Sequence, residues 1–253
     1  MKELIKSKLK GIELQYDVHI LLAVESGSRA WGFESPDSDY DVRFIYSRKH
    51  NEYLKLEETR DVIELPIDDM LDINGWDLAK ALRLLYKSNP TLFEWLSSPI
   101  VYYRDEDFFS ALEPLLPEYF SSKKGLYHYL SMAKGNYREY LQGEVVKAKK
   151  YFYVLRPVLA CRWILDKGTT PPMKFKELVA AELPSELQGD VDYLLDIKMN
   201  SPEIKTIPRV DAVNKYLDES IEEISSLISE LKEPQKNSWE PLDKLFLSTI
   251  QKG

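Results

Sequence analysis

Two aspartates one residue apart, Asp39 and Asp41, are the pair in this sequence best suited to chemistry. Side chains alternate between the two faces of an extended strand, so these two carboxylates project to the same side. Like charges this close repel each other unless a cation lies between them, and carboxylate oxygens are ligands that Mg²⁺ and Mn²⁺ prefer. The pattern therefore predicts a divalent metal site on a strand.

A turn of small residues upstream predicts a phosphate site. Gly27 and Ser28 follow the apolar segment 18–24, which has the length of a buried strand. Glycine lets the backbone approach a ligand closely. If residues 28–31 open a helical turn, its free N–H groups and the Ser28 hydroxyl point toward a bound anion. The residues from there to Asp39 are then a loop that returns the chain to the sheet.

Two arginines accompany these motifs. Arg29 directly follows the turn, and Arg43 shares a strand face with Asp41 because it lies two residues further on. Each is a candidate phosphate ligand, and each is equally suited to balance the charge of the acids. The sequence leaves both interpretations open.

The elements that must position these residues form an α+β fold. Strand-like alternation ends near residue 103, and the chain from Asp105 onward has helical patterning, so we predict a catalytic domain over 1–104 and a helical domain over 105–253. The predicted elements of the first domain are a helix over 2–14, strands over 18–25 and 39–46, a helix over 48–56, strands over 61–67 and 70–74, and a helix over 76–86.

The two motifs also carry a resemblance to a known family. GSRAWG followed by SDYDVR is similar to the Gly-Ser turn and Asp-x-Asp strand of the DNA polymerase beta nucleotidyltransferase superfamily. Over residues 25–172 the chain resembles, more narrowly, the bacterial and phage predicted nucleotidyltransferases related to the RNA-repair-associated polymerase beta group. The further blocks that carry this resemblance are IELPIDD, DINGWDLAKALRLLYKSNP, EWLSSPIVY and KKYFYVLRPVLACRW. It implies a small mixed sheet that holds the metal and a helical part that closes over the nucleotide.

The chemistry of such an enzyme uses a third carboxylate on a strand beside the Asp-x-Asp strand. The family pattern places an Asp shortly before a Leu-x-Lys helix start, which matches Asp72 in this chain. Glu64 remains a rival because it lies between apolar neighbours on a predicted strand. Asp77 is better placed to begin a helix as an acid favoured by the helix dipole. The other candidates are Asp68 and Asp69.

Basic residues concentrate in the helical half. Residues 121–176 contain twelve Lys and Arg against three acids, a net charge of +9, so the rest of the chain carries −17. Within this region Lys149, Tyr153 and Arg156 share a helix face by spacing, and Lys150 is an equally good phosphate ligand. A similar Lys, aromatic, Arg pattern occurs in relatives of the family, so we expect these four residues to contact the nucleotide. A solvated basic face explains the pattern as well. Pro157 predicts a kink or a new helix.

Composition limits the remaining classes of function. The chain has 253 residues, 44% of them hydrophobic, and a net charge of −8, which argues against indiscriminate binding to nucleic acid. No apolar stretch approaches a membrane span and the N-terminus lacks a signal-peptide core, so we expect a cytoplasmic protein with no membrane partner. A single cysteine, Cys161, excludes an internal disulfide. The oligomeric state is left open.

We therefore predict a Mg²⁺- or Mn²⁺-dependent nucleotidyltransferase. It would transfer a nucleoside monophosphate from an NTP to a hydroxyl acceptor, for example an RNA end, and release pyrophosphate. Asp39, Asp41 and Asp72 would be the catalytic metal ligands, with Gly27 and Ser28 at the phosphates. The alternative is a catalytically silent module that binds a nucleotide or an RNA end, and a third hypothesis is modification of a partner toxin. Acceptor and base preference stay open.

Overall fold

The computed structural model describes residues 1–66, 70–200, 205–231 and 237–251. Contacts between Cα atoms divide the chain into two compact units. The first comprises Met1–Ala30, Asp39–Phe120 and Lys236–Gly253, and the second comprises Trp31–Ser38 and Ser121–Gln235. The chain passes from the first unit to the second after Phe120. The domain boundary that we predict near residue 104 remains a prediction. No helix in the described ranges is both long enough and apolar enough to cross a lipid bilayer.

A five-stranded mixed sheet organises the first unit. Its spatial order is β3-β4-β2-β1-β5, in which β2 and β4 run parallel and the other neighbouring strands run antiparallel. The strands are β1 (Val18–Ser26), β2 (Tyr40–Arg48), β3 (Val62–Glu64), β4 (Leu71–Asp77) and β5 (Val101–Arg104). Strand β2, which contains Asp41, and strand β4, which contains Asp72, are therefore neighbours in this sheet.

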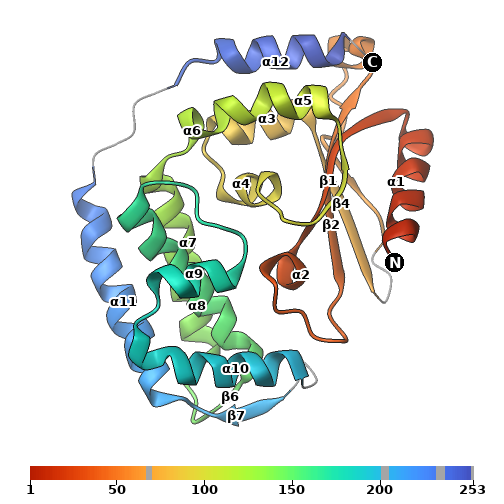
Figure 1. Ribbon diagram of the computed structural model, residues 1–253. Helices are drawn as coiled ribbons and strands as arrows, with labels where there is room; N and C mark the ends of the chain where they lie inside the picture. The colour runs from red at the N-terminus through yellow and green to blue at the C-terminus, as the bar shows by residue number, and fades with distance from the viewer. Residues whose placement is uncertain (67–69, 201–204, 232–236, 252–253) are drawn as a thin grey trace. The chain divides into compact units, whose positions relative to one another are not determined.

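Helices cover both faces of this sheet (Figure 1). Helix α1 (Lys2–Tyr16) packs Ile5, Leu9 and Ile12 on the face that contains Val42. The opposite face carries α3 (Leu78–Tyr86), α4 (Pro90–Leu96), α5 (Glu106–Leu112) and α12 (Glu240–Ile250). Side chains of β2 contribute alternately to the two cores, as the period of a strand requires.

The register between β2 and β4 is fixed by a tight cross-strand pair. Phe44 lies opposite Gly75, and a Cβ atom added at Gly75 would lie 2.2 Å from the Phe44 ring. The ring fills the space left by the absent side chain and is itself fully buried. A slip of one residue would expose the apolar face of β4, so this pair sets which residues of the two strands face each other.

The second unit is built from helices. Its main elements are α7 (Ser122–Tyr140), α8 (Ala148–Lys167), α9 (Phe175–Glu182), α10 (Gln188–Asn200) and α11 (Asp211–Glu230), with a small antiparallel pair β6 (Val145–Lys147) and β7 (Thr206–Pro208). The segment Trp31–Ser38 belongs to this unit because Phe33 packs between Phe152 and Phe175, at ring-centroid distances of 4.9 Å and 5.5 Å.

The remaining elements are short connections. They are α2 (Gly27–Trp31), α6 (Leu116–Tyr119) and the 3₁₀ turns η1 (His50–Leu54), η2 (Glu113–Leu115) and η3 (Ser185–Leu187).

Several predicted boundaries change in the structure. The helix predicted over 48–56 is the 3₁₀ turn η1. The strand predicted over 61–67 is shorter, since only Val62–Glu64 form β3 among the described residues 61–66, and residue 67 lies outside the described residues. The helix predicted from Trp76 begins at Leu78, because the Asp77 side chain accepts a hydrogen bond from the Ala79 amide and starts α3 there. The β6–β7 pair was not predicted, because its strands are short and distant in sequence. Helix α8 continues through Pro157 without a new start.

Candidate active site

The central strands bring two of the predicted carboxylates together. In the parallel pair β2–β4, Asp41 lies directly opposite Asp72. Both side chains remain 32% exposed, while their strand neighbours Val42 and Ile73 are buried in the core on the other face of the sheet. Two acids are thus displayed side by side on an accessible part of an otherwise apolar sheet.

A cation already lies between these acids. The Nη2 atom of Arg43 donates to Asp72 Oδ2 at 2.7 Å and to Asp41 Oδ1 at 3.2 Å. Its Nη1 atom donates to the main-chain oxygens of Val42 at 3.1 Å and Asp72 at 3.0 Å. Arg43 therefore offsets part of the negative charge of the two carboxylates in this structure, which is one of the two roles predicted for it.

The Gly-Ser turn lies against Asp41. Gly27 has a φ of +67° and begins the short helix α2, and a Cβ atom added to it would lie 2.2 Å from Asp41 Oδ2. Only glycine allows this approach. Burial raises the pKa of Asp41 above its ordinary value; Arg43 opposes this shift, and the charges of Asp72 and Asp39 reinforce it. The carboxylate is thus in surroundings that favour binding of a cation.

Arg29 and Asp39 connect the turn to the start of β2. The Arg29 Nε atom donates to the main-chain oxygen of Asp39 at 3.0 Å, and its guanidinium lies over the Tyr40 ring, 3.7 Å from the centroid. The Asp39 side chain is exposed. Arg29 therefore holds the backbone of the predicted metal strand in addition to any role at a phosphate.

Glu25 is a residue of this site that the sequence analysis did not single out. It is fully buried at the end of β1, where its Oε1 accepts a hydrogen bond from the Asp41 amide at 2.7 Å and its Oε2 accepts one from the Tyr102 hydroxyl. Burial raises its pKa, an effect that the Tyr102 and Asp41 hydrogen bonds oppose. The available signal was an acidic residue that directly continues an apolar strand, because such a carboxylate needs specific partners.

The donor set fits a divalent cation in chemistry. Two carboxylates converge on one positive charge, and hard oxygen ligands of this kind suit Mg²⁺ or Mn²⁺. In the described part of the chain, no three His, Cys, Asp or Glu side chains form a group that could hold a metal ion as they are placed. Arg43 occupies the space between the acids, so a metal would have to displace its guanidinium.

The other candidates for the third carboxylate lie elsewhere or outside the described residues. Glu64 pairs with Arg60 and accepts a hydrogen bond from Asn74 Nδ2 at 3.2 Å on the edge strand β3. Asp77 caps α3, as its alternative interpretation predicted, and accepts a hydrogen bond from Tyr53 at 3.0 Å. Asp68 and Asp69 lie outside the described residues. Asp72 is thus the candidate that the sheet places beside Asp41.

The four predicted nucleotide contacts of the helical half all lie on α8 in the second unit. Lys149 and Lys150 are half-buried, and Lys150 Nζ lies over the Tyr140 and Tyr153 rings, 3.5 Å and 4.6 Å from their centroids. Arg156 does not belong to an exposed basic face. It is only 3% exposed, and its guanidinium lies 4.7 Å from the Trp31 ring centroid. The spacing of Arg156 from Lys149 and Tyr153 predicted a shared helix, but the burial of Arg156 depends on Trp31, which packs against it from another part of the chain.

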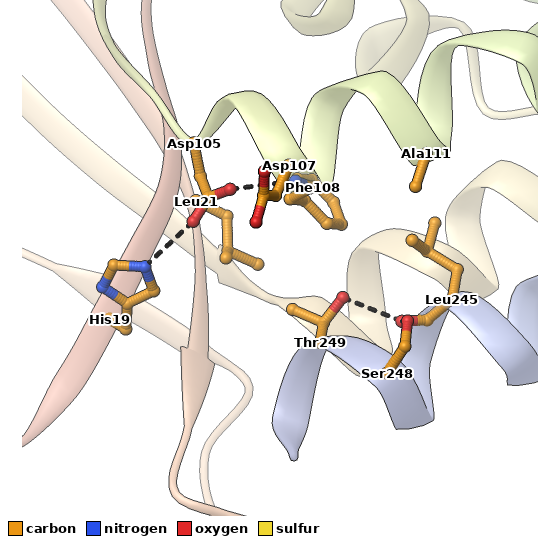
Figure 2. Close-up of a pocket in the computed structure, with 9 residues that line it drawn as sticks. All are labelled: His19, Leu21, Asp105, Asp107, Phe108, Ala111, Leu245, Ser248 and Thr249. Carbon is orange, nitrogen blue, oxygen red and sulfur yellow. Dashed lines mark hydrogen bonds and ion pairs between the residues drawn. The ribbon is translucent and has the colours of Figure 1, made fainter. Parts of the chain in front are cut away.

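A separate cavity of about 470 Å³ is lined in part by His19 and Leu21, near the start of β1 (Figure 2). At its rim His19 Nε2 lies 3.3 Å from Asp105 Oδ2. Burial acts to raise the pKa of Asp105, but the Phe108 amide and His19 outweigh it and hold that pKa below its ordinary value. Ser248 and Thr249 hydroxyls donate to the Leu245 oxygen. The residues that line this cavity include none of the candidate active-site residues, so it is distinct from that site.

The mixed sheet, the facing aspartates and the Gly-Ser turn define a polymerase beta-like nucleotidyltransferase. The chain belongs to the RNA repair pathway DNA polymerase beta family, whose sequence model matches residues 1–248. It is 49% identical over 255 residues to the uncharacterized protein YcgL of Bacillus subtilis (strain 168), across 99% of this chain and 97% of that protein. A nucleotidyltransferase-like protein from Exiguobacterium sibiricum 255-15 is 14% identical with a TM-score of 0.31, over 98% of this chain and 80% of that one.

Proposed function

We propose that this protein transfers a nucleoside monophosphate from an NTP to a hydroxyl acceptor and releases pyrophosphate. The observation that carries the proposal is the pairing of Asp41 with Asp72 across adjacent parallel strands, with Gly27 in contact with Asp41. Family membership supports the reaction class. The preferred cofactor is Mg²⁺ or Mn²⁺, since the ligands are carboxylates.

Each residue of the site has a role in this proposal. Asp39, Asp41 and Asp72 would hold the divalent cation, which neutralises charge on the triphosphate and stabilises the charge that develops at the α-phosphorus. Gly27 and Ser28 would hold the phosphates through backbone N–H groups and the hydroxyl. The acceptor oxygen forms a bond to the α-phosphorus, the bond from that phosphorus to the bridging oxygen breaks, and pyrophosphate leaves. Asp72 accepts the proton from the acceptor hydroxyl.

An RNA end is the acceptor that we propose. One support is the family itself, whose members are assigned to an RNA repair pathway. The other is the net charge of +9 over residues 121–176. In this proposal Lys149, Lys150 and Tyr153 on α8 contact the nucleotide or the RNA. Arg29, beside the phosphate turn, is a further cation for phosphate binding in this proposal, and Arg43 becomes one once a metal has displaced its guanidinium from the acids. Arg156 is buried and is left out of the proposed phosphate contacts.

A second candidate is a catalytically silent module that binds a nucleotide or an RNA end. The specific observation in its favour is that Arg43 already bridges the two acids. A protein that never binds a metal would keep this ion-pair arrangement permanently. The two candidates therefore differ in whether a divalent cation displaces Arg43.

Radiolabelled NTPs, Mg²⁺ or Mn²⁺ and a panel of RNA ends, small alcohols and proteins provide the test. We expect metal-dependent transfer of label and release of pyrophosphate. Asp72→Asn should abolish both the transfer and the pyrophosphate release. Glu64→Gln, which changes the rival candidate for the third carboxylate, should leave both intact. Binding of NTP or RNA without metal-dependent transfer to any acceptor would favour the silent module. Loss of transfer in Glu64→Gln with activity retained in Asp72→Asn would refute the assignment of Asp72.

A further inference from the structure

Glu25 is a buried carboxylate that contacts the backbone of a proposed metal ligand. It is 0% exposed, and its Oε1 lies 2.7 Å from the amide nitrogen of Asp41. In the antiparallel pair β1–β2, Glu25 lies opposite Val42 and the next residue of β1 lies opposite Asp41. The Asp41 amide, near the start of β2, therefore donates its hydrogen bond to the Glu25 side chain.

The Glu25 side chain is held by β5, and its backbone is held by the segment that leads into β5. The Tyr102 hydroxyl donates to the second carboxylate oxygen. The Ser98 hydroxyl donates to the main-chain oxygen of Glu25 at 2.6 Å, and the Glu25 amide donates to the Ile100 oxygen at 2.9 Å. Since every hydrogen-bonding group of Glu25 has a fixed partner, this carboxylate is a rigid acceptor.

Three contacts together determine how Asp41 is oriented. Its amide is held by Glu25, its Oδ2 lies against Gly27, and its Oδ1 accepts a hydrogen bond from Arg43. The Arg43 contact involves a partly exposed side chain that a metal would displace, whereas the acceptor of the Glu25 contact is a fully buried carboxylate. The contact with Glu25 therefore remains when a ligand enters the site.

We infer that Glu25 is a positioning residue, which fixes the backbone of Asp41 so that the Asp41 carboxylate is directed at the metal before the metal binds. This inference rests on the proposed function. Partners of this kind hold a ligand in its binding geometry, and their loss costs about 10- to 100-fold in metal affinity or activity. A purely structural Glu25 would affect stability and leave the metal affinity of the folded protein unchanged.

Two substitutions of similar length separate these roles. Glu25→Gln keeps an oxygen that can accept from the Asp41 amide, whereas Glu25→Met removes the acceptor. Per folded molecule, we expect Glu25→Met to weaken Mn²⁺ binding and lower kcat by about 10- to 100-fold each. The KM for NTP should change much less, because the phosphate turn is untouched. Glu25→Gln should restore both quantities to within a few-fold of wild type.

Mn²⁺ affinity and amide hydrogen exchange distinguish failure of this inference from failure of the proposed function. If the wild type binds Mn²⁺ but transfers no nucleotide, the proposed reaction fails, and a loss of Mn²⁺ affinity in Glu25→Met alone still supports the positioning role. A folded Glu25→Met with wild-type kcat and Mn²⁺ affinity overturns it. If Glu25→Met does not fold, the Asp41 amide decides: slow exchange in the wild type and in Glu25→Gln supports the inference, and exchange as fast as in an unfolded chain overturns it.

Discussion

Replacement of Gly27 by alanine tests how closely the phosphate turn approaches the metal strand. An alanine at this position would keep φ at +67°, and its Cβ would lie 2.2 Å from Asp41 Oδ2 and 3.0 Å from Asp41 Cγ. Both distances are far inside van der Waals contact, so the Asp41 carboxylate would have to move. The substitution should therefore affect stability and metal binding together.

The two costs of Gly27→Ala can be separated by a matched control. Gly168 has the same φ of +67° with no atom within 4 Å of an added Cβ, so Gly168→Ala reports backbone strain alone. That strain is about 1–2 kcal/mol. The displaced carboxylate adds about 1–3 kcal/mol for overpacking. Gly27→Ala should thus cost about 2–5 kcal/mol, the sum of these two contributions.

A double-mutant cycle with Asp41→Ala isolates the contact. In that background the Asp41 Oδ2 and Cγ atoms are absent, and the Asp41 Cβ lies 3.5 Å from the added methyl, which is ordinary contact. We expect a coupling free energy of about 1–3 kcal/mol between Gly27→Ala and Asp41→Ala, and additivity within about 0.5 kcal/mol for the Gly168→Ala control. Hydrogen exchange of buried β1 and β2 amides measures the cost of Gly27→Ala in the first unit, and exchange of buried α8 amides measures the cost of Gly168→Ala in the second. Equal costs of Gly27→Ala in both backgrounds would refute the reasoning.

Three further substitutions test other parts of the structure. Arg43→Met should destabilise the metal-free protein by about 1–3 kcal/mol, because two partly exposed carboxylates lose a shared cation; melts should then show a larger Mn²⁺ stabilisation than in wild type, and a smaller one would contradict this. Asp77→Ala should cost about 0.5–2 kcal/mol as a lost cap, whereas Asp77→Asn keeps the acceptor. Burial raises the pKa of Asp77 above 3.8, so its contribution to the stability of the wild type should fall as pH rises from there through the folded pKa. In urea titrations the Asn variant should lack this part of the slope, and an identical slope in both proteins would disprove the assignment. Phe33→Ala should cost about 3–5 kcal/mol in calorimetry, and a loss under 1 kcal/mol would show that its ring cluster is not a core.

The positions of Asp41 and Arg43 on one strand could be predicted because that pattern is local, whereas Asp39, predicted to share the strand, lies just before β2, which begins at Tyr40. Alternation on a strand placed Asp41 and Arg43 on one face, and the family pattern indicated Asp72. The facing arrangement of Asp41 and Asp72 also required the parallel β2–β4 register, which depends on how Phe44 packs over Gly75. Such a register is a tertiary property, since nothing in the sequence of either strand alone specifies its neighbour.

Other features depended on contacts that local patterns do not contain. The hydrogen bonds of Glu25 depend on Tyr102 of β5, which is distant from it in the sequence. Arg156 has helical spacing with Lys149 and Tyr153, but its burial comes from Trp31 and Met173, which lie outside its helix. Pairing over long sequence separations is the information that propensity and periodicity lack.

The loop between the two motifs gives the site a covalent link to the second unit. Trp31–Ser38 leaves the first unit after Ala30 and returns at Asp39, so it is joined directly to the phosphate turn and to the metal strand. It is held in the helical unit by the buried Phe33 and by Lys198, whose Nζ donates to Ser35 Oγ at 2.9 Å. A sequence that needed only to reverse direction would use a short polar turn. The buried aromatic and the buried lysine instead make this loop part of the helical unit, although both of its ends join the motifs of the first unit.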